Sequence, residues 1–413
     1  MSARAHSSVP EAGRGAYPDG GGRPWLAALY RLPPAAFSPD WRAVLGAFGA
    51  REGAALAAGV YAFDSGRSGL RFALERLAEA APLRRRVVVP AYTCYSVAAA
   101  VEHAGLELVV CDIDPRTLDF APRELEQVVG QDTLCIVAAQ LFGCGVDLDH
   151  AAEVARRAGC HVIEDAAQAS DPANDVHARA KVTLRLISTG RGKPLSTAGG
   201  GFVALYEPAL RGRFDEIYGR LPHRRGPVAD ARQAARLALM KMLVHPRLFW
   251  APASIPALHI GETIYPERIA PERPEALRLR LYPRLRTRFE QERRQRRGHA
   301  QVYGAALGAG ADEIRPRAVS GADYAPHRFP VYLGHDRDVV GASLRRAGRY
   351  GVASVYPAPL THLPRVRRFC VNVDAPIPGA EWTARHLITL PTHAHVDARS
   401  RQRVLNALEE LGV

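Results

Sequence analysis

The order of apolar runs and amphipathic stretches along the chain predicts alternating strands and helices. Four short apolar runs predict buried strands, at residues 86–90, 108–114, 134–140 and 160–165. Helical patterns lie between them, at residues 96–104 and 148–158. This alternation predicts an α/β fold, with a mostly parallel sheet covered by helices on both faces. Ligands of such sheets bind beyond the carboxyl ends of the strands, and Asp165 stands at one such end.

The pattern changes in a predicted insertion, residues 211–274. Its most apolar part, residues 231–250, is interrupted by Arg236, Lys241 and His245, so it cannot form a helix that spans a membrane. We expect it to pack against a partner subunit or to cover the active site. Membrane contact through residues 231–256 is the less favoured alternative.

The rest of the chain predicts a long helix and a smaller α/β domain. Residues 275–307 form an Arg-rich helical stretch, whose cations suit a solvated face at least as well as a binding patch. Strands at 329–333 and 386–390 and helices near 338–347 and 397–411 follow. The predicted organisation is a disordered leader and N-terminal arm (1–58), a large domain (59–274), and the long helix with a small C-terminal domain (275–413).

Composition narrows the possible partners and the compartment. The net charge is +13, but the arginines are spread over the whole chain rather than gathered beside aromatic residues. We therefore expect the protein to attract anionic substrates and not to bind nucleic acid.

The 6 cysteines form no C-x-x-C pair and the N-terminus lacks an apolar signal core. These features predict a cytoplasmic protein without a structural metal.

One lysine lies in a Gly-rich loop between two β-prone runs, within the segment LRLISTGRGKPLSTAGGGFVAL. Of the 55 lysines and arginines, only Lys181, Lys193 and Lys241 are lysines. A guanidinium stays protonated, whereas an amine can lose its proton and attack a carbonyl. Lys193, the lysine of this loop, is therefore a candidate nucleophile, with an ordinary surface lysine as the alternative.

A small-residue turn, SGRSG at residues 65–69, runs directly into a helical pattern. Free backbone N–H groups and the helix dipole at such a turn attract anions, so the turn predicts a phosphate site. An ordinary helix N-cap would leave the same signature. Asp165 and Gln168, likewise, could be a capping aspartate and a surface amide.

The turn, the strand-end carboxylate and the loop lysine together match the needs of pyridoxal phosphate. Its phosphate must be anchored, its ring nitrogen kept protonated by a carboxylate, and its aldehyde held by a lysine. The sequence resembles the DegT/DnrJ/EryC1/StrS family of sugar aminotransferases, which have the aspartate-aminotransferase-type fold. The matching stretches reach from about residue 60 to the end, apart from the insertion, and include VVVPAYTCYSVAAAVEHAG, LFG, HVIEDAAQA, ISTGRGKPLSTAGGGFV, YPAPLTHLP and ITLPTHAHV.

The resemblance implies a role for each matching residue. Lys193 matches the lysine that forms a Schiff base with the cofactor, Asp165 matches the partner of the ring nitrogen, and Gln168 lies beside the ring hydroxyl. The residues that match phosphate contacts are Ser188, Gly66, Arg67 and Ser68.

The sequence departs from the family pattern at three places. Arg67 replaces a threonine or similar small residue, and Cys94 replaces the aromatic residue that stacks on the cofactor. Tyr92 or Tyr95 are alternatives for that stacking. An asparagine that crosses the dimer to the phosphate is also missing, and Arg67 or Arg191 are candidates to replace it.

The resemblance implies an aminotransferase that moves an amino group from glutamate to a keto group of a nucleotide-linked sugar or a related polyol. It also implies a homodimer with the cofactor at the subunit interface. A cofactor-dependent sugar lyase or dehydratase, and a non-catalytic regulator on the same scaffold, remain alternatives. Lysine rather than histidine at position 193 favours amino transfer.

Overall fold

The computed structural model describes residues 58–169, 181–193, 196–223, 226–243, 265–308 and 324–412. The predicted leader lies outside the described residues, as do residues 244–264 of the predicted insertion. Among the described residues, no helix has both the length and the apolar character needed to cross a bilayer.

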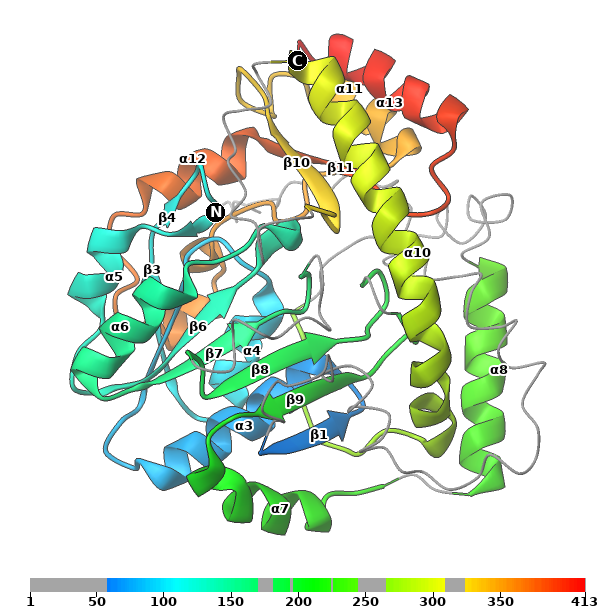
Figure 1. Ribbon diagram of the computed structural model, residues 1–413. Helices are drawn as coiled ribbons and strands as arrows, with labels where there is room; N and C mark the ends of the chain where they lie inside the picture. Colours follow the sequence, from blue (N-terminus) through cyan, green and yellow to red (C-terminus); the bar gives the residue numbers. More distant parts are fainter. Residues whose placement is uncertain are drawn as a thin grey trace, which may run out of the picture.

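A seven-stranded sheet forms the centre of the described structure, with strand order β1-β9-β8-β7-β6-β2-β3 (Figure 1). Strand β9 runs antiparallel to both β1 and β8, whereas the remaining neighbours are parallel. The predicted mostly parallel sheet is therefore confirmed. Its strands are β1 (Gly59–Phe63), β2 (Arg86–Pro90), β3 (Glu107–Cys111), β6 (Thr133–Ala139), β7 (His161–Asp165), β8 (Leu184–Ser188) and β9 (Gly201–Leu205).

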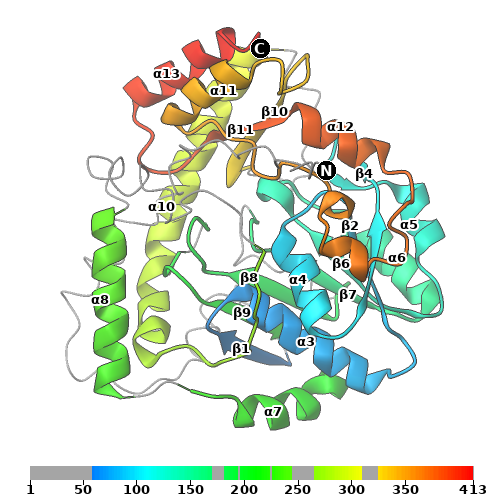
Figure 2. The same ribbon diagram turned by 180° about the vertical axis from the view of Figure 1, so that it is seen from behind.

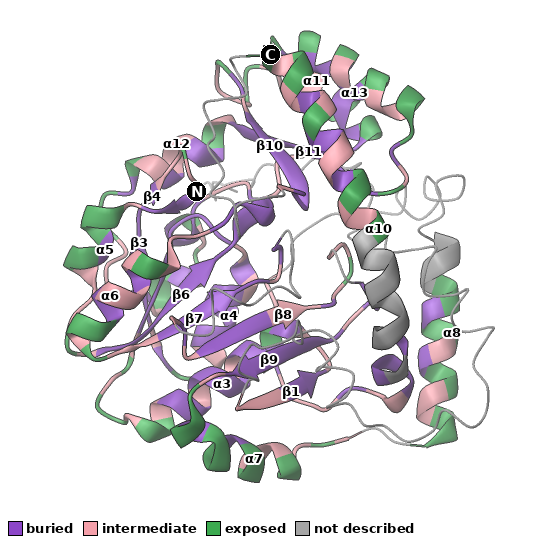
Figure 3. Ribbon diagram, in the orientation of Figure 1, coloured by how far each residue is buried: buried purple, intermediate pink, exposed green. Residues whose placement is uncertain are grey.

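Helices cover both faces of this sheet. On one face, seen from the front in Figure 2, lie α3 (Gly66–Ala80) and α4 (Tyr95–His103). On the other lie α5 (Pro122–Val128) and α6 (Leu148–Ala158). Successive residues of a strand point to opposite faces, so Val87 and Val89 join the core under α3 and α4, whereas Val88 joins the core under α5 and α6. Figure 3 shows the strands buried between the two helical layers.

The predicted single strand at residues 108–114 is wrong, because the chain leaves the sheet at Asp112. The Asp112 carboxylate accepts hydrogen bonds of 2.8 Å from the backbone N–H groups of Gly379 and Ala380. The next residues form a separate strand, β4 (Ile113–Asp114), which pairs with β5 (Asp119–Phe120). Strand β3 therefore ends where the Asp112 carboxylate binds two backbone N–H groups of a helix far away in the sequence.

The C-terminal part consists of the long helix α10 (Ala276–Leu307) and a small antiparallel pair of strands with further helices. These elements confirm the predicted strands and helices, while the domain boundaries themselves stay a prediction. Tyr303 of α10 packs in one core with apolar residues of the strands and of the last helix. The elements are β10 (Arg328–Tyr332), α11 (Gly341–Ala347), α12 (Pro378–His386), β11 (Leu387–Pro391) and α13 (Ala398–Glu409).

The sequence suggested a solvated face or a binding patch for the arginines of α10. At least one of them is on neither, because it is buried. Arg296 is buried, and its guanidinium donates hydrogen bonds to the backbone oxygen of His327 (2.6 Å) and to Thr392 Oγ1 (3.0 Å). Arg296 therefore ties the long helix to the small strands. Among the side chains of this stretch that the structure describes, Arg294 is exposed and Arg293 and Arg297 are partly exposed.

The predicted insertion begins with α7 (Arg211–Arg220) and α8 (Pro227–Leu243). Helix α8 runs beside the first half of α10, as both views show (Figures 1 and 2). The backbone N–H of Leu277 donates to Asp230 Oδ1 over 3.0 Å and joins the starts of the two helices. On α8, Leu237 is fully buried, whereas Leu239 is 50% exposed. Whether α8 packs on a partner subunit stays a prediction.

Candidate active site

The carboxyl ends of β7 and β8 and the N-terminus of α3 meet at one edge of the sheet. Ser65 is the N-cap of α3, and its Oγ accepts a hydrogen bond of 3.2 Å from the backbone N–H of Ser68. Ser65 also forms a bridge with Gly200 in the loop that contains Lys193. The predicted phosphate turn and the predicted lysine loop are thus neighbours in space.

Ser188 lies directly beside the turn, at the end of β8. A Cβ atom on Gly66 would stand 3.0 Å from Ser188 Cβ and 3.1 Å from Ser188 Oγ. A Cβ on Gly201 would stand 2.6 Å from the Gly66 backbone. Two glycines therefore allow this close approach, which places a serine hydroxyl against the amide end of a helix. Such a cradle suits a phosphate.

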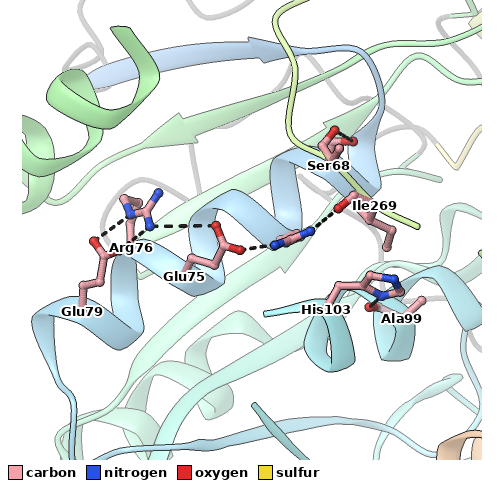
Figure 4. A network of polar contacts seen from close by, with 9 residues as sticks. Ser68, Glu75, Arg76, Glu79, Ala99, His103 and Ile269 are labelled. Carbon is pink, nitrogen blue, oxygen red and sulfur yellow. Dashed lines mark hydrogen bonds and ion pairs between the residues drawn. The ribbon is translucent and has the colours of Figure 1, made fainter. Parts of the chain in front are cut away.

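The other residues of the turn differ in exposure. Ser68 is buried, and its Oγ lies 2.7 Å from Ser65 Oγ and 3.4 Å from the Ala270 oxygen. Arg67 is exposed on the first turn of α3. The segment before α10 runs alongside this turn, where the Ile269 carbonyl accepts a hydrogen bond from Arg71 (Figure 4).

Asp165 ends β7 and is buried, with 8% of its surface exposed. Its Oδ1 accepts a hydrogen bond of 3.0 Å from the backbone N–H of Ala167. Burial raises the pKa of Asp165, while this hydrogen bond and the positive charge of Lys193 oppose the shift. The lysine thus lies within electrostatic range of the carboxylate. A buried carboxylate in such a setting is strongly stabilised by a cationic partner.

Hydrogen bonds fix the loop that carries Lys193. The backbone N–H of Lys193 donates to the Gly190 oxygen over 3.3 Å, and Gly192 adopts a φ of 74°, a region that suits glycine. Thr189 Oγ1 donates to the Gly199 oxygen over 2.9 Å, which joins the two ends of the loop. The Lys193 side chain is half-buried at this position.

Gln168 lies beside Asp165 and is held from two sides. Its Oε1 accepts a 3.0 Å hydrogen bond from the backbone N–H of Phe142, in the short 3-10 helix Leu141–Gly143. Its Nε2 donates a 2.6 Å hydrogen bond to the Tyr356 hydroxyl. Sequence reasoning assigned no role to Phe142 or Tyr356. Phe142 lies in the LFG motif and Tyr356 in the YPAPLTHLP motif. Both motifs support the family resemblance, and they could have pointed to these two residues.

Cys94 is half-buried at the N-cap of α4, and its Sγ lies 3.4 Å from Ser96 Oγ. The two tyrosines that are alternatives for the stacking role, Tyr92 and Tyr95, both pack on Tyr356. Tyr92 is fully buried, and its hydroxyl donates to the Tyr356 oxygen over 3.2 Å. The ring centroids of Tyr95 and Tyr356 are 6.4 Å apart. The aromatic group near Cys94 therefore centres on Tyr356.

The site combines an amine, a buried carboxylate and an anion cradle. A primary amine can form a covalent bond to an aldehyde and can carry protons. A carboxylate can keep a nearby ring nitrogen protonated, and the cradle can hold a phosphate. Together these groups have the chemistry that an aldehyde cofactor bearing a phosphate requires.

Comparison with known proteins agrees with this chemistry. The model of the DegT/DnrJ/EryC1/StrS aminotransferase family matches residues 53–218 and 284–409. The chain therefore belongs to this family, as its sequence motifs suggested. The unmatched residues between 218 and 284 include α8.

Two curated relatives match most of the chain. The UDP-2-acetamido-2-deoxy-3-oxo-D-glucuronate aminotransferase of Pseudomonas aeruginosa is 27% identical over 326 residues, 78% of each protein. A pleiotropic regulatory protein of Geobacillus stearothermophilus is 25% identical over 336 residues, 78% of this chain and 77% of the relative.

Solved structures show the same fold. The sugar aminotransferase CalS13 from Micromonospora echinospora has a TM-score of 0.66 at 19% identity, covering 97% of this chain and 99% of that one. The aminotransferase TlmJ from Streptoalloteichus hindustanus has a TM-score of 0.66 at 21% identity, covering 96% and 99%.

Proposed function

We propose that this protein transfers an amino group from glutamate to a keto group of a nucleotide-linked sugar or a related polyol. Its class, a pyridoxal-phosphate-dependent aminotransferase, follows from its family. The observation that carries the proposal is the convergence of Lys193, Asp165 and the Ser65 turn at one edge of the sheet.

The residues present fit pyridoxal phosphate. The Gly66 and Ser188 cradle would hold its phosphate, because only a glycine leaves space beside the serine hydroxyl. Asp165 has a buried carboxylate that would pair with the protonated ring nitrogen. Lys193, in the neighbouring loop, would bind the aldehyde.

The bound cofactor supplies an electron sink for the pair of electrons left when the donor carbon loses its proton. Lys193 Nζ, released from the aldehyde when the donor amine replaces it there, would move that proton from the donor carbon to the former aldehyde carbon, and in the second half-reaction would move one from there to the acceptor carbon. The Asp165 carboxylate would hold the proton on the ring nitrogen. Gln168, fixed by Phe142 and Tyr356, presents its amide beside the site.

The nature of the acceptor rests on the relatives. One relative is named for a UDP-linked 3-oxo sugar acid, and another for GDP-perosamine synthesis. The L-glutamine:2-deoxy-scyllo-inosose aminotransferase of Streptomyces fradiae, 30% identical over 154 residues, is named for a cyclic polyol ketone. These names support a keto sugar or polyol as acceptor. The Streptomyces fradiae name gives L-glutamine, the amide of the proposed donor glutamate, as the amino donor.

Two further parts of the proposal concern the cofactor's surroundings. We propose a homodimer with the cofactor at the subunit interface, and Arg67 as a phosphate contact in place of the missing asparagine. Arg67 stands exposed beside the cradle, on the first turn of α3. A charge-assisted contact there is worth about 1.5–3 kcal/mol. Arg67→Thr should therefore weaken cofactor binding by about one to two orders of magnitude.

The direct test follows the two half-reactions separately. Holoprotein mixed with L-glutamate or L-glutamine should release the 2-oxo acid and convert the cofactor to its amine form, as seen by absorbance. A panel of keto sugars and keto polyols is then tested for restoring the original absorbance. A non-catalytic regulator, the alternative that the Geobacillus relative's name favours, would produce no 2-oxo acid. Lys193→Arg is the negative control.

A further inference from the structure

Arg278 packs against the loop that carries Lys193. It lies on the first turn of α10, and only 1% of its surface is exposed. A Cβ atom on Gly199 of the loop would stand 3.1 Å from Arg278 Cζ and 3.2 Å from its Nη2, and closer still to its Nη1. Only a glycine therefore leaves room for the guanidinium at this place.

Gly199 is the residue at which the two ends of this loop are joined. Its oxygen accepts hydrogen bonds from Thr189 Oγ1 (2.9 Å) and Thr197 Oγ1 (2.6 Å), and its N–H donates to the Thr189 oxygen over 3.3 Å. Thr189 is followed by Gly190, whose oxygen accepts the hydrogen bond of the Lys193 N–H. A shift of Gly199 would therefore be passed on to the backbone of Lys193.

The guanidinium of Arg278 is held in place by Glu275. The Glu275 Oε2 lies 3.2 Å from Arg278 Nε and 3.1 Å from Nη2. Removing two charges from water offsets much of the attraction between them, so a buried pair of this kind adds little to stability. The backbone N–H of Leu277 donates to Asp230 Oδ1 of α8, which fixes the start of α10 as well. The pair and this bond together give the guanidinium one orientation against Gly199.

We infer that Arg278 is a positioning residue for Lys193. By packing on Gly199 it holds the closed loop in the conformation in which the Lys193 amine meets the cofactor aldehyde. Two groups that are held in place form a bond more readily than two groups that must first be ordered. The inference rests on the proposed role of Lys193. Arg278 lies between the two segments that the family model matches, so the family assignment does not itself assign this contact.

A purely structural role of Arg278 is the competing explanation, and two forms of the cofactor separate the two. Pyridoxal phosphate can bond to Lys193 through its aldehyde. Pyridoxamine phosphate carries an amine there and forms no such bond, although its phosphate and ring are the same. A residue that positions Lys193 should affect the affinity for the first form only, whereas a general loss of structure should affect both.

The test is equilibrium titration of the full-length protein, freed of cofactor, with each of the two forms. Arg278→Gln should weaken binding of pyridoxal phosphate at least tenfold and that of pyridoxamine phosphate less than twofold. Arg296→Gln is the matched control, because it removes another buried arginine of the same helix. It should lower the free energy of unfolding and leave the ratio of the two affinities unchanged.

An unchanged ratio in Arg278→Gln, or the same change of ratio in Arg296→Gln, would overturn the inference. Should Arg278→Gln fail to fold, Arg278→Lys decides by the same comparison. It keeps a cation for Glu275 but has no planar guanidinium to pack on Gly199, so a wild-type ratio in this variant would also overturn the inference.

Borohydride labelling of the wild-type protein in the same preparation separates this inference from the proposal on which it rests. If Lys193 is not labelled, the proposed role of Lys193 is wrong, and its positioning by Arg278 with it. If Lys193 is labelled and the ratio does not change in Arg278→Gln, only the positioning role is wrong.

Discussion

The Gln168 side chain donates a 2.6 Å hydrogen bond from Nε2 to the hydroxyl of Tyr356. This bond joins the end of the central strand β7 to a loop of the C-terminal part, 188 residues later in the sequence. Both groups are buried. The orientation of the glutamine amide next to Asp165 therefore depends on both parts of the chain.

Replacing Tyr356 with phenylalanine should lower stability and turnover but should not abolish cofactor binding. The ring would keep its contacts, but the buried N–H of Gln168 would lose its acceptor, at a cost of about 1–3 kcal/mol. We expect a lower free energy of unfolding and reduced turnover. Denaturant unfolding and steady-state kinetics would measure both. Tyr350→Phe, at a partly exposed tyrosine, is the control, and equal effects of the two substitutions would refute the role of the hydroxyl.

Gly66→Ala should weaken cofactor binding, because the new Cβ would push Ser188 away from the cradle. Loss of one charge-assisted hydrogen bond to phosphate corresponds to about one to two orders of magnitude in affinity. Equilibrium titration of the apoprotein with pyridoxal phosphate measures this. Gly212→Ala is the matched control, because a Cβ there meets no atom within 4 Å. An unchanged affinity of Gly66→Ala would mean that the phosphate lies elsewhere.

Asp165→Asn should keep the cofactor but lose most of the turnover. The amide has nearly the same shape, yet it carries no negative charge to hold the proton on the ring nitrogen. A buried ion-pair partner is worth several kcal/mol, so the rate should fall by at least two orders of magnitude. Turnover and bound cofactor are measured on the same sample. Near-normal turnover with full cofactor content would show that Asp165 has another role.

The strands, the helices and the lysine loop could be predicted from sequence because their signals are local. Apolar runs and the small-residue turn at Ser65 depend on residues close together in the chain. The break at Asp112 and the burial of Arg296 could not be predicted, because their partners, Gly379 and Thr392, are far away in the sequence. The Gln168–Tyr356 bond escaped prediction for the same reason. The roles of Arg67 and Cys94 stay predictions.

Acid should destabilise the fold partly through His299. Burial, together with the charges of Arg401 and Arg296, lowers the pKa of this histidine from 6.5 to about 4. Between these values the unfolded chain binds more protons than the folded one, so the free energy of unfolding falls as the pH decreases through this window. The contribution is at most about 1.4 kcal/mol per pH unit.

His299→Gln should flatten this dependence, because glutamine does not titrate in this pH range. Its amide oxygen can still accept the hydrogen bond that Arg401 donates to His299 Nδ1 over 3.3 Å, so the substitution keeps this contact. Urea unfolding between pH 4 and 7 would measure the two slopes. His393, whose pKa is lowered mainly by burial and only in small part by the charge of His299, contributes to the slope of both proteins. Identical slopes would contradict the assignment to His299.

The most direct test of the central claim is the identity of the lysine that binds the cofactor. Borohydride reduction of the holoprotein, followed by digestion and mass spectrometry, should place the label on Lys193. The label should be absent from Lys193→Arg. Lys181, whose amine lies 2.6 Å from Asp149 Oδ1, should remain unlabelled. A label on Lys181 or Lys241, or none at all in cofactor-saturated protein, would contradict the account.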